Sequence, residues 1–358
     1  MSIRGAAAKG APLFDDEARE YDAVLVMSFG GPEGMDEVMP FLENVTRGRN
    51  VPRERLLEVA HHYEHFGGVS PINQQNRALI AALEAELTAH ARHLPVYFGN
   101  RNWHPFITDT VRQMRGDGVR RAIVFVTSAF SSYSGCRQYR EDIIRAQAEV
   151  GEGAPEFDKL RMFYNHPGYI EPCVANVKAA LARIPMERRG AAHVAFTAHS
   201  LPLSMARECD YEAQLQEAVR LVAEGAGCGD CALAYQSRSG PPHVPWLEPD
   251  ILDHMEKLAA RGVRDLVILP IGFTSDHMEV LFDLDIEAVE KAKELGLNMI
   301  RAATVGTAAP YVGMIRELIE ERMAARPERR ALGDRGPNHD ICPLDCCLPG
   351  TSGKGPPR

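Results

Sequence analysis

Apolar runs and amphipathic segments alternate along most of the chain. Seven short apolar runs predict strands, at residues 23–29, 95–99, 121–128, 193–199, 231–237, 265–272 and 298–305. Longer segments with helical periodicity lie between them, for instance 74–91, 137–150, 205–225 and 309–325. Continuous apolar strands separated by helices are typical of parallel sheets covered on both faces. The pattern therefore predicts a doubly wound α/β protein.

The order of these elements indicates two similar lobes and two irregular ends. Three strands are predicted before residue 165 and four after it, so we expect an N-terminal lobe over 21–165 and a C-terminal lobe over 166–326. Residues 1–20 lack the apolar segment of a signal peptide, and we expect a disordered leader there. Residues 327–358 are rich in Gly, Pro and charge, which predicts an irregular, cysteine-containing extension.

Composition excludes some classes of protein. The 358 residues are 45% hydrophobic, enough for a sizeable core, and carry a formal net charge of −9. That charge argues against a nucleic-acid-binding surface. No apolar run reaches the roughly 18 residues of a transmembrane helix, so we expect a cytoplasmic protein without a membrane span. Eight cysteines without an export signal favour a reducing compartment, where thiols are more often free, catalytic or metal-bound than paired.

An unusual row of acids lies in TSDHMEVLFDLDIEAVE, residues 274–290. An ideal α-helix turns about 100° per residue, which places five acids within an arc of about 80°. These acids are Glu279, Glu290, Asp283, Asp276 and Glu287. Like charges four residues apart cost roughly 0.2–0.5 kcal/mol per pair, and the helix dipole favours acids only in the first turn. We therefore expect a positive partner, the alternative being a solvated helix face.

His199 ends a predicted strand in the segment FTAHSLP. Open α/β sheets place their chemistry beyond the carboxyl ends of the strands. Glu279 lies in the loop after another predicted strand, so the two side chains are expected near each other. An imidazole that faces carboxylates suits metal binding or proton transfer, although a histidine at a strand end can also be structural.

Glycines follow the first predicted strand in FGGPEG, residues 29–34. Such glycines can cradle a phosphate, but the spacing is not GxGxxG and Pro32 removes a backbone donor. The segment instead favours close approach of the backbone to a flat ligand. Arginines gather in TRGRNVPRER, residues 46–55, where they either bind carboxylates or form a solvated basic patch.

Six segments, in the same order along the chain, resemble the ferrochelatase family. They are FGGPEG, HFGGVSPIN (65–73), VYFGNRNWHPF (96–106), FTAHSLP (196–202), YQSRSGPPHVPWLEP (235–249) and PIGFTSDHMEVLFDLDIE (270–287). The resemblance implies two Rossmann-like lobes with a porphyrin between them and Fe²⁺ as the metal substrate. The coproporphyrin ferrochelatases of actinobacteria resemble the chain best, which implies coproporphyrin III as substrate and coproheme decarboxylase as a recipient of the product.

The resemblance also assigns roles to individual residues. It implies that His199 and Glu279 handle Fe²⁺ from opposite sides of the macrocycle. Asp283 and Glu287 would continue an acidic path for metal ions or protons. The porphyrin contacts that it implies are Ser70, Tyr139, Phe29, Tyr63 and Arg47.

Three cysteines lie close together in the C-terminal segment HDICPLDCCLPG. They are Cys342, Cys346 and Cys347. Three thiols leave a tetrahedral metal site or an iron–sulfur cluster one ligand short. Some ferrochelatases bind a [2Fe–2S] cluster through three C-terminal cysteines and one internal cysteine, and the resemblance points to Cys136 as the internal ligand. Cys228 and Cys231, in CGDC, form a competing pair, and the C-terminal thiols could also bind a structural zinc ion or stay free.

Other functions stay open at this point. Protoporphyrin IX ferrochelatases tend to associate with membranes through an apolar lip, whereas the corresponding region here, residues 44–66, is charged. A non-enzymatic iron or Fe–S protein would use the acids as a store. A nucleotide-dependent Rossmann enzyme would need a fingerprint that is missing. We therefore expect an enzyme, a monomeric ferrochelatase.

Overall fold

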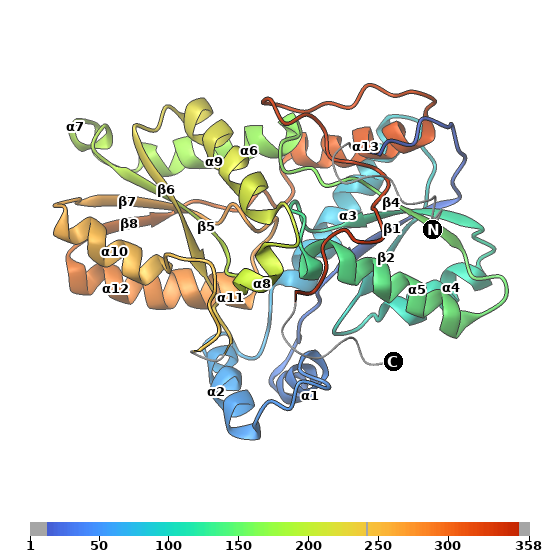
Figure 1. Cartoon of the computed structure of the whole chain (residues 1–358), viewed down its shortest axis with the longest axis horizontal. Helices are drawn as coiled ribbons and strands as arrows, with labels where there is room; N and C mark the ends of the chain where they lie inside the picture. The colour runs from blue at the N-terminus through green and yellow to red at the C-terminus, as the bar shows by residue number, and fades with distance from the viewer. Residues whose placement is uncertain (1–12, 241–242, 351–358) are drawn as a thin grey trace.

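Two parallel four-stranded sheets, each flanked by helices, form the computed structural model, which describes residues 13–240 and 243–350 (Figure 1). The first sheet has the order β2-β1-β3-β4 and the second β6-β5-β7-β8. The strands are β1 Ala23–Ser28, β2 Val96–Asn100, β3 Arg121–Val126, β4 Glu156–Lys159, β5 His193–His199, β6 Asp230–Gln236, β7 Asp265–Leu269 and β8 Asn298–Arg301. This arrangement confirms the predicted α/β fold with two Rossmann-like lobes.

The central strands are the ones that the sequence predicts best. All six residues of β1 and all five of β7 are buried, as expected for strands covered on both faces. The sequence predicted three strands in the first half and four in the second. The structure has four in each, because the first half also contains β4. β4 is a four-residue edge strand, EFDK, in which only Phe157 is buried. The last strand is also shorter than predicted, since β8 ends at Arg301.

Helices cover both faces of each sheet and match most predicted segments. In the first half they are α1 Met35–Val45, α2 Arg53–Glu64, α3 Ile72–Ala89, α4 Ile107–Gly116, the π-helix η1 Tyr133–Arg137 and α5 Gln138–Val150. In the second half they are α6 Pro167–Ala182, α7 Met186–Arg189, α8 Leu203–Ala206, α9 Tyr211–Ala226, α10 Ile251–Ala260, α11 Met278–Val280, the π-helix η2 Leu281–Glu287, α12 Ala288–Leu295 and α13 Ala309–Met323. The predicted segment 205–225 is divided between α8 and α9. Within the described part of the chain, no helix is both long and apolar enough to cross a bilayer.

One apolar core joins the two halves. It contains Val24 and Phe125 from the first sheet and Phe196 from the second. Helix α13, the last in the chain, packs on α3 as well as on α6, and its Tyr311 contacts the ring of Phe125 at 6.4 Å between centroids. The carboxyl ends of both sheets are therefore held in a fixed relation to each other.

The ends of the described chain lie against each other. Of the predicted leader, residues 1–12 fall outside the described residues, whereas the carboxylate of Asp15 is buried and pairs with Arg322 at 3.2 Å. In the extension, Arg329 donates to the carbonyl of Asp15 at 2.9 Å and to Asp340 at 2.7 Å. Ion pairs of the buried Asp15 therefore hold this segment to the rest of the protein, and the disordered leader over 1–20 stays a prediction. The limits of the two lobes stay predictions.

Candidate active site and cysteine cluster

His199 occupies the carboxyl end of β5, with Glu279 opposite it. The ring Nδ1 lies 2.5 Å from the carbonyl oxygen of Ser200, so Nδ1–H donates to that oxygen. Nε2 then keeps its lone pair and lies 3.8 Å from Oε2 of Glu279. The two side chains are 31% and 53% exposed, so both can reach a ligand. The structure thus brings together the histidine and the acid that the sequence singled out, because β5 and β7 are neighbours in the sheet.

The segment that carries the acids is not one regular α-helix. His277 caps its first turn by accepting the backbone N–H of Glu279 at 3.2 Å. After α11 the chain forms the π-helix η2, from Leu281 to Glu287, before α12 continues. A π-helix holds more residues per turn than an α-helix, so the predicted single stripe at 100° per residue is wrong. Such π-helical insertions occur frequently at functional sites.

Asp283 is the most buried acid of the row. It accepts hydrogen bonds from the hydroxyl of Ser237 and from Nε2 of Gln236, the latter at 3.2 Å. Burial, together with the negative charges of Glu279 and Glu287, raises the pKa of Asp283 to about 7. A carboxyl group with this pKa exchanges protons near neutral pH. The acidic row can therefore hold either a proton or a cation at its centre.

Glu287, at the far end of the row from Glu279, also has a shifted pKa. Partial loss of water around its carboxyl group and the neighbouring charges of Asp250 and Glu290 raise the pKa of Glu287. Glu279 and Glu287 are exposed, whereas Asp283 between them is partly buried. The three acids therefore form a row in which two accessible carboxyl groups flank one that exchanges protons.

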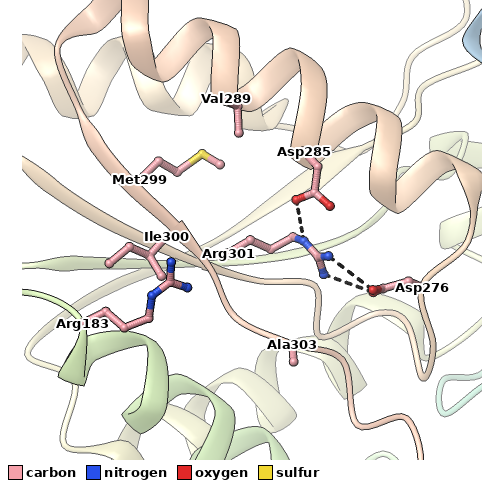
Figure 2. Close-up of a pocket in the computed structure, with 8 residues that line it drawn as sticks. All are labelled: Arg183, Asp276, Asp285, Val289, Met299, Ile300, Arg301 and Ala303. Carbon is pink, nitrogen blue, oxygen red and sulfur yellow. Dashed lines mark hydrogen bonds and ion pairs between the residues drawn. The ribbon is translucent and has the colours of Figure 1, made fainter. Parts of the chain in front are cut away.

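One acid of the predicted stripe, Asp276, faces a different partner. Asp276 precedes α11 and, with Asp285 of η2, binds the guanidinium group of Arg301 on β8 (Figure 2). The positive group that the sequence required is thus Arg301, and it compensates Asp276 and Asp285 rather than the row facing His199. The placement of Asp276 in the same stripe as Glu279 is therefore wrong.

The predicted porphyrin contacts differ in their exposure. Phe29, at the end of β1, is 41% exposed and packs edge-on against Phe41. Tyr63 packs on the same Phe41, and its pKa is raised by burial and by the negative charge of Glu279. Arg47 is exposed. Phe29 and Tyr63 thus belong to one aromatic group near Glu279.

Two other predicted contacts, Ser70 and Tyr139, are buried, as is Tyr63. Ser70 packs on Gly31, where an added Cβ would lie 2.6 Å from the Cβ of Ser70. The glycine of FGGPEG is thus explained by protein packing and not by a ligand alone. The guanidinium group of Arg101 lies over the ring of Tyr139, 5.5 Å from the ring centroid.

Sequence reasoning missed the residues that hold the acidic row in place. Ser237 and Gln236 support Asp283, and Arg301 holds Asp276 and Asp285. Ser237 has φ of 62°, a conformation that few non-glycine residues adopt and that often marks functional sites. The sequence signal that could have indicated Ser237 is the polar segment directly after β6, which ends at Gln236.

The four predicted cluster cysteines converge. Cys136 contacts the side chains of Cys342 and Cys347, Cys342 contacts Cys346, and the sulfur atoms of Cys346 and Cys347 lie 3.4 Å apart. The four thiols therefore form a closed ring. His339, which the sequence did not indicate, adds Nε2 at 3.8 Å from Sγ of Cys346. Among the described residues, His339, Cys342 and Cys346 form the one group of three or more donors close enough to share a metal ion.

Positive groups surround the ring of thiols. Arg137 and Arg140 donate to four backbone carbonyls of the 342–346 segment at 2.7 to 3.4 Å. Burial alone would lower the pKa of Lys159, but the facing cysteines raise it. Cys347 has φ of 55°, which is the irregular backbone that two adjacent cysteines need to face one centre. Nearby cations favour thiolates, the form that binds metal.

The competing cysteine pair is placed elsewhere. Cys228 follows α9 and Cys231 lies in β6, and both pack against the main apolar core. Neither belongs to a group of three close donors among the described residues. The geometry therefore favours the C-terminal thiols with Cys136 over the C-x-x-C pair.

The fold is that of the metal chelatases. The structure of the chelatase SirB from Bacillus subtilis with Fe³⁺ superposes with a TM-score of 0.54 at 13% identity, covering 86% of this chain and 100% of that one. At this identity the likeness concerns the fold alone.

Sequence comparison identifies the family within this class. The ferrochelatase family model matches residues 21–323, and the chain belongs to the ferrochelatase family. It is 58% identical to a ferrochelatase from Rhodopirellula baltica, over 93% of this chain and 95% of the relative. It is 51% identical to a coproporphyrin III ferrochelatase from Streptomyces griseus, over 91% and 93% respectively.

Proposed function

We propose that this protein inserts ferrous iron into coproporphyrin III to form Fe-coproporphyrin (coproheme). The observation that carries the proposal is the pair of His199 and Glu279, whose Nε2 and Oε2 atoms lie 3.8 Å apart beside a row of acids. Family membership supports metal insertion, and the relative from Streptomyces griseus supports the choice of porphyrin.

Insertion requires a proton acceptor and a cation guide. A free porphyrin carries two pyrrole protons, which must leave as Fe²⁺ takes their place. Nε2 of His199 has the free lone pair to accept the two protons in turn, because Nδ1–H is committed to Ser200, and the partly exposed ring can pass each of them to solvent. Glu279, Asp283 and Glu287 supply the carboxylates that carry Fe²⁺ and exchange its water ligands.

The porphyrin contacts follow from exposure. Phe29 offers an exposed aromatic face, Tyr63 lies behind it through Phe41, and Arg47 is free to meet a propionate. Ser70 and Tyr139 are buried, so contact with a propionate would require local movement around them. We therefore assign Phe29 and Arg47 to direct contact. Tyr63 is also buried, so we assign it, with Ser70 and Tyr139, to contact after such movement.

Substrate preference is the direct test of the proposal. We expect kcat/KM for coproporphyrin III to exceed that for protoporphyrin IX by roughly tenfold or more, about 1.4 kcal/mol, because each added carboxylate can meet an arginine of the 46–55 segment. Rates with both porphyrins are measured under identical detergent conditions. An Arg47→Gln variant should narrow the preference. Equal or reversed rates in the wild type would favour the protoporphyrin enzyme.

Replacing Asp283 by asparagine should stabilise the protein at alkaline pH. The pKa of Asp283 is about 7 in the folded state, against 3.8 for the free side chain. Between these two pH values the unfolded chain releases the proton and the folded protein keeps it, so the free energy of unfolding falls as the pH rises through this range. The cost at pH 8 is at most about 4 kcal/mol. We expect Asp283→Asn to raise the free energy of unfolding at pH 8 and to change it little near pH 4, as measured by urea denaturation.

The same variant should lose activity. The matched control is Glu294→Gln, an exposed acid of α12 outside the acidic row, which should change neither stability nor rate. A stabilised Asp283→Asn protein with reduced metal insertion would mean that the buried charge is kept for function. An unchanged pH dependence of stability would contradict the assignment of a raised pKa to Asp283.

We further infer that Cys136, Cys342, Cys346 and Cys347 hold a [2Fe–2S] cluster. Four buried or partly buried thiols in a closed ring, with Lys159 beside them, suit four thiolate ligands and an anionic centre. Such a cluster supplies a one-electron redox centre and a cross-link between Cys136 and the extension. His339 adds a nitrogen donor at the same site, which leaves a zinc ion as the alternative.

A further inference from the structure

Arg301 joins two segments on either side of the residues that face His199. Its Nε lies 2.6 Å from Asp285, and its Nη1 and Nη2 lie 3.1 and 3.3 Å from the two carboxylate oxygens of Asp276. Asp276 precedes α11, whereas Asp285 belongs to η2 (Figure 2). Glu279 and Asp283 lie between these two acids in the sequence. One guanidinium group therefore spans the segment that carries the acidic row.

Asp276 is fixed from two further directions. Its backbone N–H donates to Oε1 of Gln75, on α3 of the first half, at 2.9 Å. Its carboxylate accepts the hydroxyl of Thr304 at 3.3 Å. Arg301 thus connects the π-helix to a point that is anchored to both halves of the molecule. A guanidinium fork can hold two carboxylates in fixed directions, which an ammonium group cannot.

The π-helix needs such support. Its hydrogen-bond pattern is rare and appears as short insertions within α-helices. Asp285 is 34% exposed and Arg301 18% exposed, so their contact is partly shielded from water. Without Arg301, Asp276 and Asp285 would lose the guanidinium group that compensates both of their charges. The guanidinium group therefore favours the backbone arrangement that the acidic row depends on.

We propose that Arg301 is a positioning residue for metal insertion, which holds Asp276 and Asp285 so that the intervening turn directs Glu279 and Asp283 towards the metal. The inference rests on the proposed function. Arg301 itself stays on the far side of the segment and touches neither porphyrin nor Fe²⁺. Its role is to keep the carboxyl groups of Glu279 and Asp283 at a fixed position relative to His199.

A cavity beside Arg301 allows a direct test. It has a volume of about 340 Å³ and is lined by Arg183, Val289, Met299, Ile300 and Ala303 in addition to the three bonded residues (Figure 2). This space equals that of several water molecules, enough to admit a small planar cation. Truncating Arg301 to alanine enlarges it further. Methylguanidinium can then occupy the position of the missing side-chain group.

The experiment measures insertion by Arg301→Ala with and without added methylguanidinium chloride. We expect kcat to fall by about 10- to 100-fold and the KM for the metal to rise, with little change in the KM for the porphyrin. Methylguanidinium should restore most of the lost rate, whereas sodium chloride at the same ionic strength should not. Arg301→Lys, which keeps the charge but not the fork, should remain impaired. Arg183→Ala is the matched control, because it lines the same cavity without bonding to either acid.

A second measurement is independent of catalysis. Backbone amide hydrogen exchange of residues 278–288 should be faster in Arg301→Ala than in the wild type and should slow again with methylguanidinium. If Arg301→Ala is too unstable to purify, Asp285→Asn removes one half of the contact and should give the same loss of rate and faster exchange at smaller size, without rescue by methylguanidinium because Arg301 is still present. Normal kinetics in these variants would overturn the proposal, and so would a loss of rate in Arg301→Ala that methylguanidinium does not restore. A wild-type protein that inserts no metal would instead refute the proposed function, while the exchange measurement would still report on the contact.

Discussion

Replacing His199 by alanine is expected to lower the rate of iron insertion by about 10²- to 10⁴-fold, the usual contribution of a general base. The reason is the arrangement of its ring: Nδ1–H is held by the carbonyl of Ser200, so Nε2 is the atom available to take a pyrrole proton. The hydroxyl of Tyr211 donates to the backbone carbonyl of His199 at 3.0 Å and fixes the residue at the end of β5. Alanine keeps the strand but removes the base.

The measurement separates chemistry from binding. Porphyrin affinity is followed by fluorescence and metal insertion by absorption under anaerobic conditions. We expect the affinity of His199→Ala to stay close to that of the wild type. His90→Ala serves as the control, because His90 is exposed at the end of α3. A His199→Ala protein with the normal insertion rate would remove the proposed mechanism, and a wild type that binds iron without porphyrin turnover would favour a non-enzymatic iron protein.

The closeness of His199 and Glu279 was predictable because strand ends are visible in a sequence. His199 and Glu279 each follow an apolar run, and parallel sheets bring the ends of neighbouring strands together. Neither apolar run, however, indicates the order in which the strands pair in the sheet. Two equally apolar strands at opposite edges would have separated the pair by the width of the sheet.

The path of the acidic segment was not predictable. Helical periodicity assumes about 100° per residue, and nothing in the letters LFDLDIE announces a π-helix. The partner that separates Asp276 and Asp285 from the other acids is Arg301, at the end of β8. A contact between residues so far apart in the sequence depends on the assembled sheet.

The two ends of the chain show a related limit. Residues 13–20 look like a polar leader, and the extension looks like a tail, because neither has enough apolar residues to form a core. They are held by buried ion pairs with each other and with the body of the protein, such as those of Asp15 and Asp340. Composition predicts well whether a segment can bury apolar side chains, but it does not predict which charged side chains form ion pairs.

Replacing Cys347 by serine is expected to abolish the visible absorption of a [2Fe–2S] cluster in the purified protein. Cys347 closes the ring of sulfur atoms between Cys136 and Cys346, so three thiols would remain for a centre that needs four ligands. Because binding energy at such a site is also folding energy, the free energy of unfolding should fall by several kcal/mol. The extension should then become sensitive to proteolysis near residue 342.

The outcomes of this experiment discriminate among three sites. Cys228→Ser should leave the spectrum unchanged, because Cys228 packs against the apolar core away from the other thiols. Loss of the bands in that variant would favour the C-x-x-C pair. A colourless wild type that contains one zinc ion per chain would replace the cluster by a tetrahedral site, for which His339 is already in place. His339→Ala distinguishes these cases in turn. The His339→Ala protein should keep the cluster if the four cysteine thiolates are its ligands. It should lose a bound zinc ion if the imidazole of His339 is one of the zinc ligands.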